Sequence, residues 1–212
     1  MPVKLFNHLD EHSVLGLWEI TESLDWLQSN IQLTVEEQQY YQHFRVEERK
    51  KQWLAYRHLL VHMLDDQHIN VIYDPSGKPV IKDSPFHVSV SHAGHYAAAI
   101  IHKHKSVGID IEKVSQRIQK VEDRFLSDLE RKHLNAVQKM DQLCIYWCAK
   151  EALYKLHGRK ELDFKTHLLI DPFPAHREGA LSGKIRKDDF DQSYELQFLK
   201  IDDYYLVYVL DF

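Results

Sequence analysis

Two acidic residues near the middle of the 212-residue chain have a spacing suited to metal binding. Asp110 and Glu112 lie in the segment 107–112 (VGIDIE), where β-branched residues alternate with other types at a period of two. The alternation predicts a short, largely buried strand, with residues two apart on one face. Gly108 is on the face of the acids and leaves room for another backbone or a ligand. A hard cation such as Mg²⁺ relieves the repulsion between two such carboxylates, although D-x-E alone is more often a solvated strand face.

A second group of charged residues lies on the helix predicted from 144 to 157, which Gly158 ends as a C-cap. Glu151 and Lys155 are four residues apart and therefore lie on one stripe of this helix, and Lys150 is the immediate neighbour of Glu151. By itself this pattern is an ordinary Glu-to-Lys pair, worth roughly a few tenths of a kcal/mol.

Basic residues crowd the first half of the helix predicted from about 46 to 66. Arg49 and Arg57 share a stripe of this helix, and Arg45 precedes it. The stripe is either a solvated basic face or a phosphate-binding edge, because arginine suits phosphate oxygens. A second basic stretch, 113–139, holds seven Lys or Arg against four acids. It is either a docking surface or a solvated face.

Polar residues at a turn and at a strand end complete the candidate set. Lys78 lies between Gly77 and Pro79, where the backbone turns and the ammonium projects. Ser91 and His92 end the strand predicted from 86 to 92. Adjacent strand residues point to opposite faces, which argues against a serine hydrolase and leaves His92 as a candidate phosphate ligand.

The composition describes a globular chain, with 44% apolar and 28% charged residues. The net charge of −5 gives no general reason to expect nucleic-acid binding, and no apolar run has the length of a membrane span or a signal-peptide core. Cys144 and Cys148 are four apart on one predicted helix and indicate small buried residues in a reducing compartment. We therefore expect a cytoplasmic protein without membrane or nucleic-acid partners.

The order of predicted elements favours an α+β fold with two similar halves that meet near residue 105. Strands, helices and strands are followed by helices and strands again. The first half includes a near capping box from Thr34 to Glu37. The second half ends in three strands, predicted at 181–186, 194–201 and 204–212, which follow the helix of Glu151.

Four segments, in this order along the chain, resemble signature motifs of the 4′-phosphopantetheinyl transferases. The segments 107–113 (VGIDIEK) and 147–155 (WCAKEALYK) are similar to the two main motifs, G-[IV]-D-x-E and [FW]-[SC]-x-K-E-[AS]-x-x-K. The segments 77–79 (GKP) and 89–94 (SVSHAG) resemble two further ones. The match is closest to the monomeric Sfp-type enzymes. One departure follows Gly158, where the family often continues with another Gly and the chain instead has Arg159-Lys160-Glu161.

This resemblance implies a fold of two similar α/β halves, 1–104 and 105–212, related by a pseudo-twofold axis, with the active site in the cleft between them. It implies a monomeric, Mg²⁺-dependent holo-[acyl-carrier-protein] synthase or 4′-phosphopantetheinyl transferase. Such an enzyme moves the phosphopantetheine arm of coenzyme A onto a serine of an apo acyl, peptidyl or polyketide carrier protein, and releases adenosine 3′,5′-bisphosphate. A carrier protein is acidic, so we expect recognition through local basic and apolar contacts.

The resemblance also assigns roles. The metal ligands would be Asp110, Glu112 and Glu151, and the catalytic residues Glu151, Lys155 and Lys150. The coenzyme A phosphates would be bound by Arg49, Lys78, Ser91, His92 and Lys155. Glu151, a metal-bound water or Glu130 would be the general base, and Arg45 and Arg57 would be ligands or structural residues.

Two other functions are compatible with the same residues. One is a non-catalytic protein of the same fold that binds coenzyme A or carrier proteins. The other is a different Mg²⁺-dependent phosphate enzyme, such as a phosphatase or a nuclease, which does not predict the segments 77–79 and 147–155.

Overall fold

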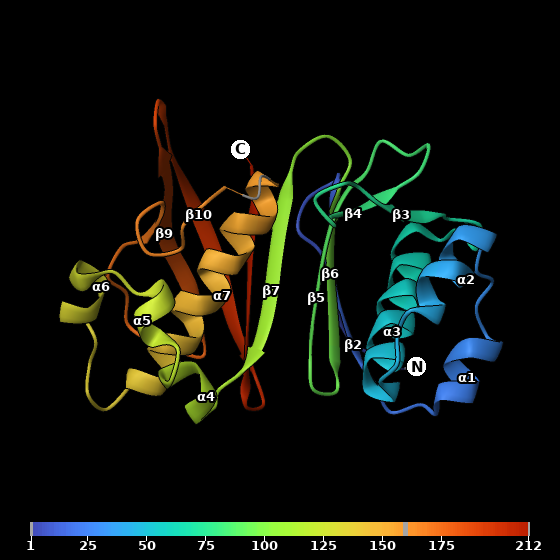
Figure 1. Cartoon of the computed structure of the whole chain (residues 1–212), viewed down its shortest axis with the longest axis horizontal. Coiled ribbons are helices and arrows are strands. Elements are labelled where there is room, and N and C mark those ends of the chain that lie inside the picture. The colour runs from blue at the N-terminus through green and yellow to red at the C-terminus, as the bar shows by residue number, and fades with distance from the viewer. Residues whose placement is uncertain (1, 159–160, 212) are drawn as a thin grey trace. The chain divides into compact units, whose positions relative to one another are not determined.

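The chain divides into two compact units, residues 1–105 and 106–212, of which the computed structural model describes residues 2–158 and 161–211 (Figure 1). The boundary comes one residue after the expected one. Both units combine helices with antiparallel sheets, so the chain is a mixed α/β protein. Residues 159–160, the first two of the three that depart from the family motif, lie outside the described part of the chain.

In the first unit, a long helix covers a four-stranded antiparallel sheet. The sheet has the order β1-β2-β6-β5, and a small hairpin pairs β3 with β4. The strands are β1 (Val3–His8), β2 (Ser13–Glu19), β3 (Val71–Tyr73), β4 (Pro79–Ile81), β5 (His87–Ala93) and β6 (Tyr96–His102). The helices are α1 (Leu24–Ser29), α2 (Val35–Gln42) and α3 (Glu47–Leu64). Helix α3 packs on β2, β5 and β6, and α1 packs on α3.

The second unit has a five-stranded antiparallel sheet in the order β7-β11-β10-β9-β8. Its strands are β7 (Val107–Lys113), β8 (Leu168–Ile170), β9 (Glu178–Lys187), β10 (Phe190–Ile201) and β11 (Tyr204–Leu210). Its helices are α4 (Gln116–Gln119), α5 (Glu122–Phe125), α6 (Asp128–Lys132) and α7 (Lys139–His157). Helix α7 lies across one face of the sheet and contacts β7, β8, β9 and β11 (Figure 1).

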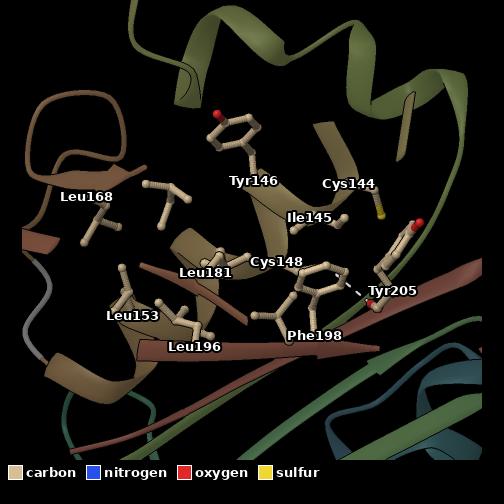
Figure 2. Close-up of a cluster of buried hydrophobic side chains, with 14 of the residues drawn as sticks. Cys144, Ile145, Tyr146, Cys148, Leu153, Leu168, Leu181, Leu196, Phe198 and Tyr205 are labelled. Carbon is tan, nitrogen blue, oxygen red and sulfur yellow. Dashed lines mark hydrogen bonds between the residues drawn. The ribbon is translucent and has the colours of Figure 1, made fainter. Parts of the chain in front are cut away.

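The core of the second unit forms between α7 and this sheet. Figure 2 shows α7 side chains such as Ile145 and Leu153 packed among Leu181, Leu196 and Phe198 of β9 and β10. Full burial of a side chain of this size stabilises the fold by about 1.5–3 kcal/mol, so the core holds α7 firmly against the sheet. Cys144 and Cys148 are both free and buried in this core, which confirms their structural interpretation.

The strongest sequence signals placed the long elements correctly. Helix α7 ends as expected at Gly158, which has φ +70° and whose N–H donates to the Tyr154 carbonyl. Ser127 caps α6 through a capping box with Glu130. The strands β1, β3, β4 and β8 were missed; three of these four have only three residues, too few to show a period. Within the described residues no helix combines the length and the apolar character needed to cross a membrane.

Candidate active site

The strand β7 and the helix α7 approach each other unusually closely at Gly108. A Cβ atom placed on Gly108 would lie 2.0 Å from the carbonyl oxygen of Ala152 on α7. The space that the sequence predicted beside Gly108 is therefore filled by the backbone of α7. This contact brings the neighbouring residue of α7, Glu151, to the face of β7 that carries the acids.

Four charged side chains from these two elements interact at this point. The Lys155 ammonium of α7 donates to Asp110 Oδ1 of β7 at 2.7 Å and to the Ile109 carbonyl oxygen at 3.0 Å. The Asp110 side chain is only 6% exposed, whereas that of Lys155 is 27% exposed. Glu112 and Glu151 are both within electrostatic range of Asp110 and Lys155. The structure thus brings the three expected metal ligands and Lys155 into one cluster.

Burial and mutual repulsion perturb two of the three carboxyl groups. Burial, followed by the negative charge of Asp110, raises the pKa of Glu112 to about 7, and Lys155 and Arg117 oppose this rise. Burial and Asp110 likewise raise the pKa of Glu151 to about 7. The single positive charge of the Lys155 ammonium cannot balance the negative charges of three ionised carboxylates. A carboxyl group with a pKa near 7 is suited to accepting a proton at neutral pH.

The donor set fits a hard divalent cation. Mg²⁺ takes carboxylate oxygens, and its charge would relieve the repulsion that raises these two pKa values. In the part of the chain that the structure describes, however, no three His, Cys, Asp or Glu side chains are already arranged around a metal position. The Lys155 ammonium is the cation in contact with Asp110 in this arrangement. The metal role of Asp110, Glu112 and Glu151 therefore remains a prediction that their chemistry supports.

Lys150 does not belong to this cluster, contrary to the expectation from the sequence. Its side chain is fully buried and donates to Glu130 Oε2 at 2.7 Å, to the Phe125 carbonyl at 2.7 Å and to the Phe164 carbonyl at 2.9 Å. Three acceptors thus occupy the three donors of the ammonium group. Glu130 is also buried and accepts from the amides of Ser127 and Ile170, which removes it as a candidate base. In this structure both side chains are engaged with each other, and the catalytic role of Lys150 stays a prediction.

In the first unit, the structure brings Arg49 and His92 together. The Arg49 Nη1 atom, on α3, lies 2.7 Å from His92 Nε2 and 3.0 Å from His92 Nδ1, on β5. The buried Gln52 links this pair to the turn after β5, because it lies 3.4 Å from Arg49 Nη1 and donates to the Gly94 carbonyl at 2.9 Å. An exposed guanidinium beside an imidazole is a suitable site for a phosphate.

Lys78 is placed elsewhere in the first unit, next to the start of β5. Asp74 Oδ1 accepts from the amides of Ser76 and Lys78 and thereby fixes the turn, in which Gly77 has φ +86°. Burial lowers the pKa of Lys78, and the positive charge of Lys78 contributes to the lowered pKa of His87. His87 and His92 are five residues apart on β5, or about 17 Å. Lys78 and Arg49 are therefore near residues at the two ends of β5.

The remaining arginines and Ser91 differ in exposure. Arg57 is fully buried and pairs with Glu37 at 2.6 Å. This supports a structural role for Arg57 and not a role as a phosphate ligand. Arg45 is exposed, just before α3. Ser91 is 8% exposed, and strand alternation places its side chain on the face of β5 opposite to that of His92.

A pocket of about 520 Å³ adjoins the carboxylate cluster, because Glu112 forms part of its wall. The other lining residues are basic, aromatic or aliphatic for the most part: Lys113, Ser115, Arg117, Ile118, Val121, Arg124, Trp147, Leu162, Asp163 and Phe164. Of the basic stretch 113–139, Arg131 and Lys139 pair with Glu122 instead. The stretch is thus divided between a pocket wall and an ion-pair network.

Sequence reasoning missed three contributors to these sites. A sequence signal for Arg117 was present, because this residue belongs to the basic stretch 113–139. Asp74 also had one, since an Asp at the first position of a turn commonly accepts from the following amides. Gln52 had none, because its position between α3 and the turn at Gly94 depends on tertiary packing.

Comparison with known proteins identifies the family. Residues 106–209 match the family model of the 4′-phosphopantetheinyl transferase superfamily. The chain is 32% identical over 116 residues to the 4′-phosphopantetheinyl transferase AcpT of Escherichia coli, which is 52% of this chain and 59% of that relative. It is 30% identical over 127 residues to the 4′-phosphopantetheinyl transferase Sfp of Bacillus subtilis, which is 57% of this chain and 54% of that relative. The chain thus spans little more than half the length of these relatives. These matches confirm the resemblance, and residues 106–209 belong to the 4′-phosphopantetheinyl transferase superfamily.

Proposed function

We propose that this protein transfers the 4′-phosphopantetheine arm of coenzyme A to a serine of an apo carrier protein, in a Mg²⁺-dependent reaction. The observation that carries the proposal is the cluster of Asp110, Glu112, Glu151 and Lys155 on β7 and α7. A Mg²⁺-dependent phosphate enzyme of another class is compatible with this cluster but does not account for the segments 77–79 and 147–155. The names of the relatives in Escherichia coli and Bacillus subtilis agree with this reaction.

In the proposed reaction, the serine oxygen attacks the β-phosphorus of coenzyme A. A new P–O bond forms to the serine, and the bond to the bridging oxygen breaks, so that adenosine 3′,5′-bisphosphate leaves with the electron pair. Glu151 is the proposed acceptor of the serine proton, since it is the carboxylate that α7 contributes to the cluster. A bound Mg²⁺, held by Asp110, Glu112 and Glu151, would neutralise charge on the pyrophosphate oxygens.

The other side chains position and neutralise the substrates. Lys155 would turn from Asp110 toward the α-phosphate when the metal takes its place. Arg49 and His92 would form one phosphate contact and Lys78 a second. Ser91 would contribute through its main chain, since its side chain is largely buried.

The pocket beside Glu112 gives space next to the reacting phosphorus. Its aromatic and aliphatic wall fits the pantetheine arm or the segment around the acceptor serine, and Arg117 and Arg124 fit an acidic carrier surface. A pseudo-twofold relation between the units, a ligand site that both of them share, a monomeric state and a cytoplasmic location remain parts of the proposal.

The test is intact-mass spectrometry of a purified apo acyl carrier protein incubated with this protein, coenzyme A and Mg²⁺. Controls omit the enzyme, omit the metal by adding EDTA, or replace the enzyme by Asp110→Ala. A metal-dependent gain of one phosphopantetheine mass supports the proposal. No gain with several carrier proteins, with coenzyme A binding measured by calorimetry, would support a non-catalytic binder instead. No gain and no binding would reject both.

A further inference from the structure

The buried pair of Lys150 and Glu130 joins three separate segments of the second unit. Glu130 is the third residue of α6 and forms a capping box with Ser127, whose amide donates to Glu130 Oε2 at 2.7 Å. The same oxygen accepts from Lys150 of α7 at 2.7 Å. The other oxygen, Oε1, accepts from the Ile170 amide of β8 at 2.9 Å. One carboxylate therefore ties α6, α7 and β8 together.

The first unit contains the same arrangement with different residues. Glu37 is the third residue of α2 and forms a capping box with Thr34, whose amide donates to Glu37 Oε2 at 2.9 Å. Its Oε1 pairs with Arg57 of α3 at 2.6 Å and accepts from the Val71 amide of β3 at 3.0 Å. The carboxylate precedes the cation by 20 residues in both units, 37 to 57 and 130 to 150.

Each of these buried pairs, here called latches, holds an element that carries a proposed ligand. In the second unit, Lys150 and Glu151 are neighbours and point about 100° apart around α7. Fixing Lys150 against Glu130 therefore fixes the direction in which Glu151 points, toward the carboxylates of β7. In the first unit, Val71 begins the β3–β4 hairpin, whose turn carries Lys78.

We propose that Lys150 is a positioning residue, which acts through Glu130 to hold Glu151 at the carboxylate cluster, and that Arg57 with Glu37 does the same for Lys78. The proposal rests on the proposed function. The two latches then predict different kinetic effects: the second acts on the residues that do the chemistry, and the first acts on a contact to coenzyme A.

The test replaces both charges of one latch, because removing one partner would leave the other buried and unpaired. The variants are Glu130→Gln with Lys150→Met, and the matched control, Glu37→Gln with Arg57→Met. Thermal unfolding shows which variants are folded, and the assays are the steady-state rates with coenzyme A and an apo carrier protein. A further readout is the rise in Tm when Mg²⁺ is added without coenzyme A, which reports on the carboxylate cluster alone.

We expect the Glu130–Lys150 double variant to lose about tenfold or more in kcat, as a small misplacement of reacting groups does, and to lose the Mg²⁺-dependent rise in Tm. The control should keep its kcat and its Mg²⁺ response and show a higher KM for coenzyme A. Normal kcat and a normal Mg²⁺ response in the folded double variant of the second latch would overturn the proposal.

Two further results separate this proposal from the proposed function. If the wild-type protein shows no transfer but binds Mg²⁺, the proposed function fails, and the Tm response still tests the latch. If a double variant does not fold, Lys150→Met alone replaces it, because it removes the α7 side chain that Glu130 holds and leaves Glu130 its bonds to the Ser127 and Ile170 amides. A kcat and a Mg²⁺ response equal to the wild type in that folded variant would also reject the positioning role.

Discussion

Replacing Gly108 by alanine tests the contact on which the candidate active site depends. The new Cβ would lie 2.0 Å from the Ala152 carbonyl oxygen, 2.9 Å from its carbonyl carbon and 3.0 Å from the Leu156 nitrogen. All three atoms belong to the backbone of α7, so no side-chain rotation relieves the contact. Since such contacts rarely fall below about 3 Å, α7 must move away from β7 by about 1 Å.

The expected magnitude follows from this displacement. Overpacking of a dense core costs up to about 3 kcal/mol, and the reduced flexibility of the unfolded chain returns about 0.4–1 kcal/mol, so we expect the free energy of unfolding to fall by about 2 kcal/mol. The movement also separates Glu151 from Asp110. A misplacement of about 1 Å costs on the order of 100-fold in rate, which is the effect expected on phosphopantetheine transfer.

The assay is urea unfolding followed by circular dichroism, together with the initial rate of transfer measured by intact mass. Gly183→Ala is the matched control, because its Cβ would meet only side-chain methyl groups, with Leu196 Cδ1 at 2.8 Å and Ile170 Cδ1 at 2.9 Å. We expect a smaller loss of stability and a rate close to that of the wild type. A second control, Ala152→Gly combined with Gly108→Ala, should give no rescue, since the contact is with the backbone. Wild-type stability and rate in Gly108→Ala would refute the close packing of α7 on β7.

Three further predictions concern the charged residues. Because the pKa values of Glu112 and Glu151 are raised from 4.5 to about 7, the folded state binds more protons than the unfolded one between these two pH values. The free energy of unfolding in EDTA should therefore fall by up to about 3 kcal/mol as the pH rises from 5 to 8, measured by urea unfolding, and Glu151→Gln should flatten the curve. Asp110→Ala should reduce transfer by at least about 100-fold while the protein stays folded, and normal transfer by a folded variant would remove the metal assignment. Arg49→Ala should weaken coenzyme A binding about tenfold in calorimetry without changing kcat at saturation, and an unchanged affinity would exclude a phosphate contact.

Sequence patterns were sufficient to predict those features of the fold and the site that lie within a single strand, helix or turn. The alternation in β7 placed Asp110 and Glu112 on one face, and helical spacing placed Glu151 and Lys155 on one stripe. The capping box at Thr34 is present as the sequence indicated. These features depend on the geometry of one strand, one helix or one turn, which the residues themselves specify.

The sequence by itself therefore determined the family, the two long helices and the residues of the carboxylate cluster. Tertiary structure alone decided which of two neighbours, Lys150 and Glu151, faces β7. Helical periodicity gives the angle between two side chains but not the direction of the helix as a whole, and that direction is set by Gly108 against Ala152 and by Glu130 against Lys150. For the same reason the contact of Arg49 with His92 was not visible, since it depends on where β5 lies relative to α3.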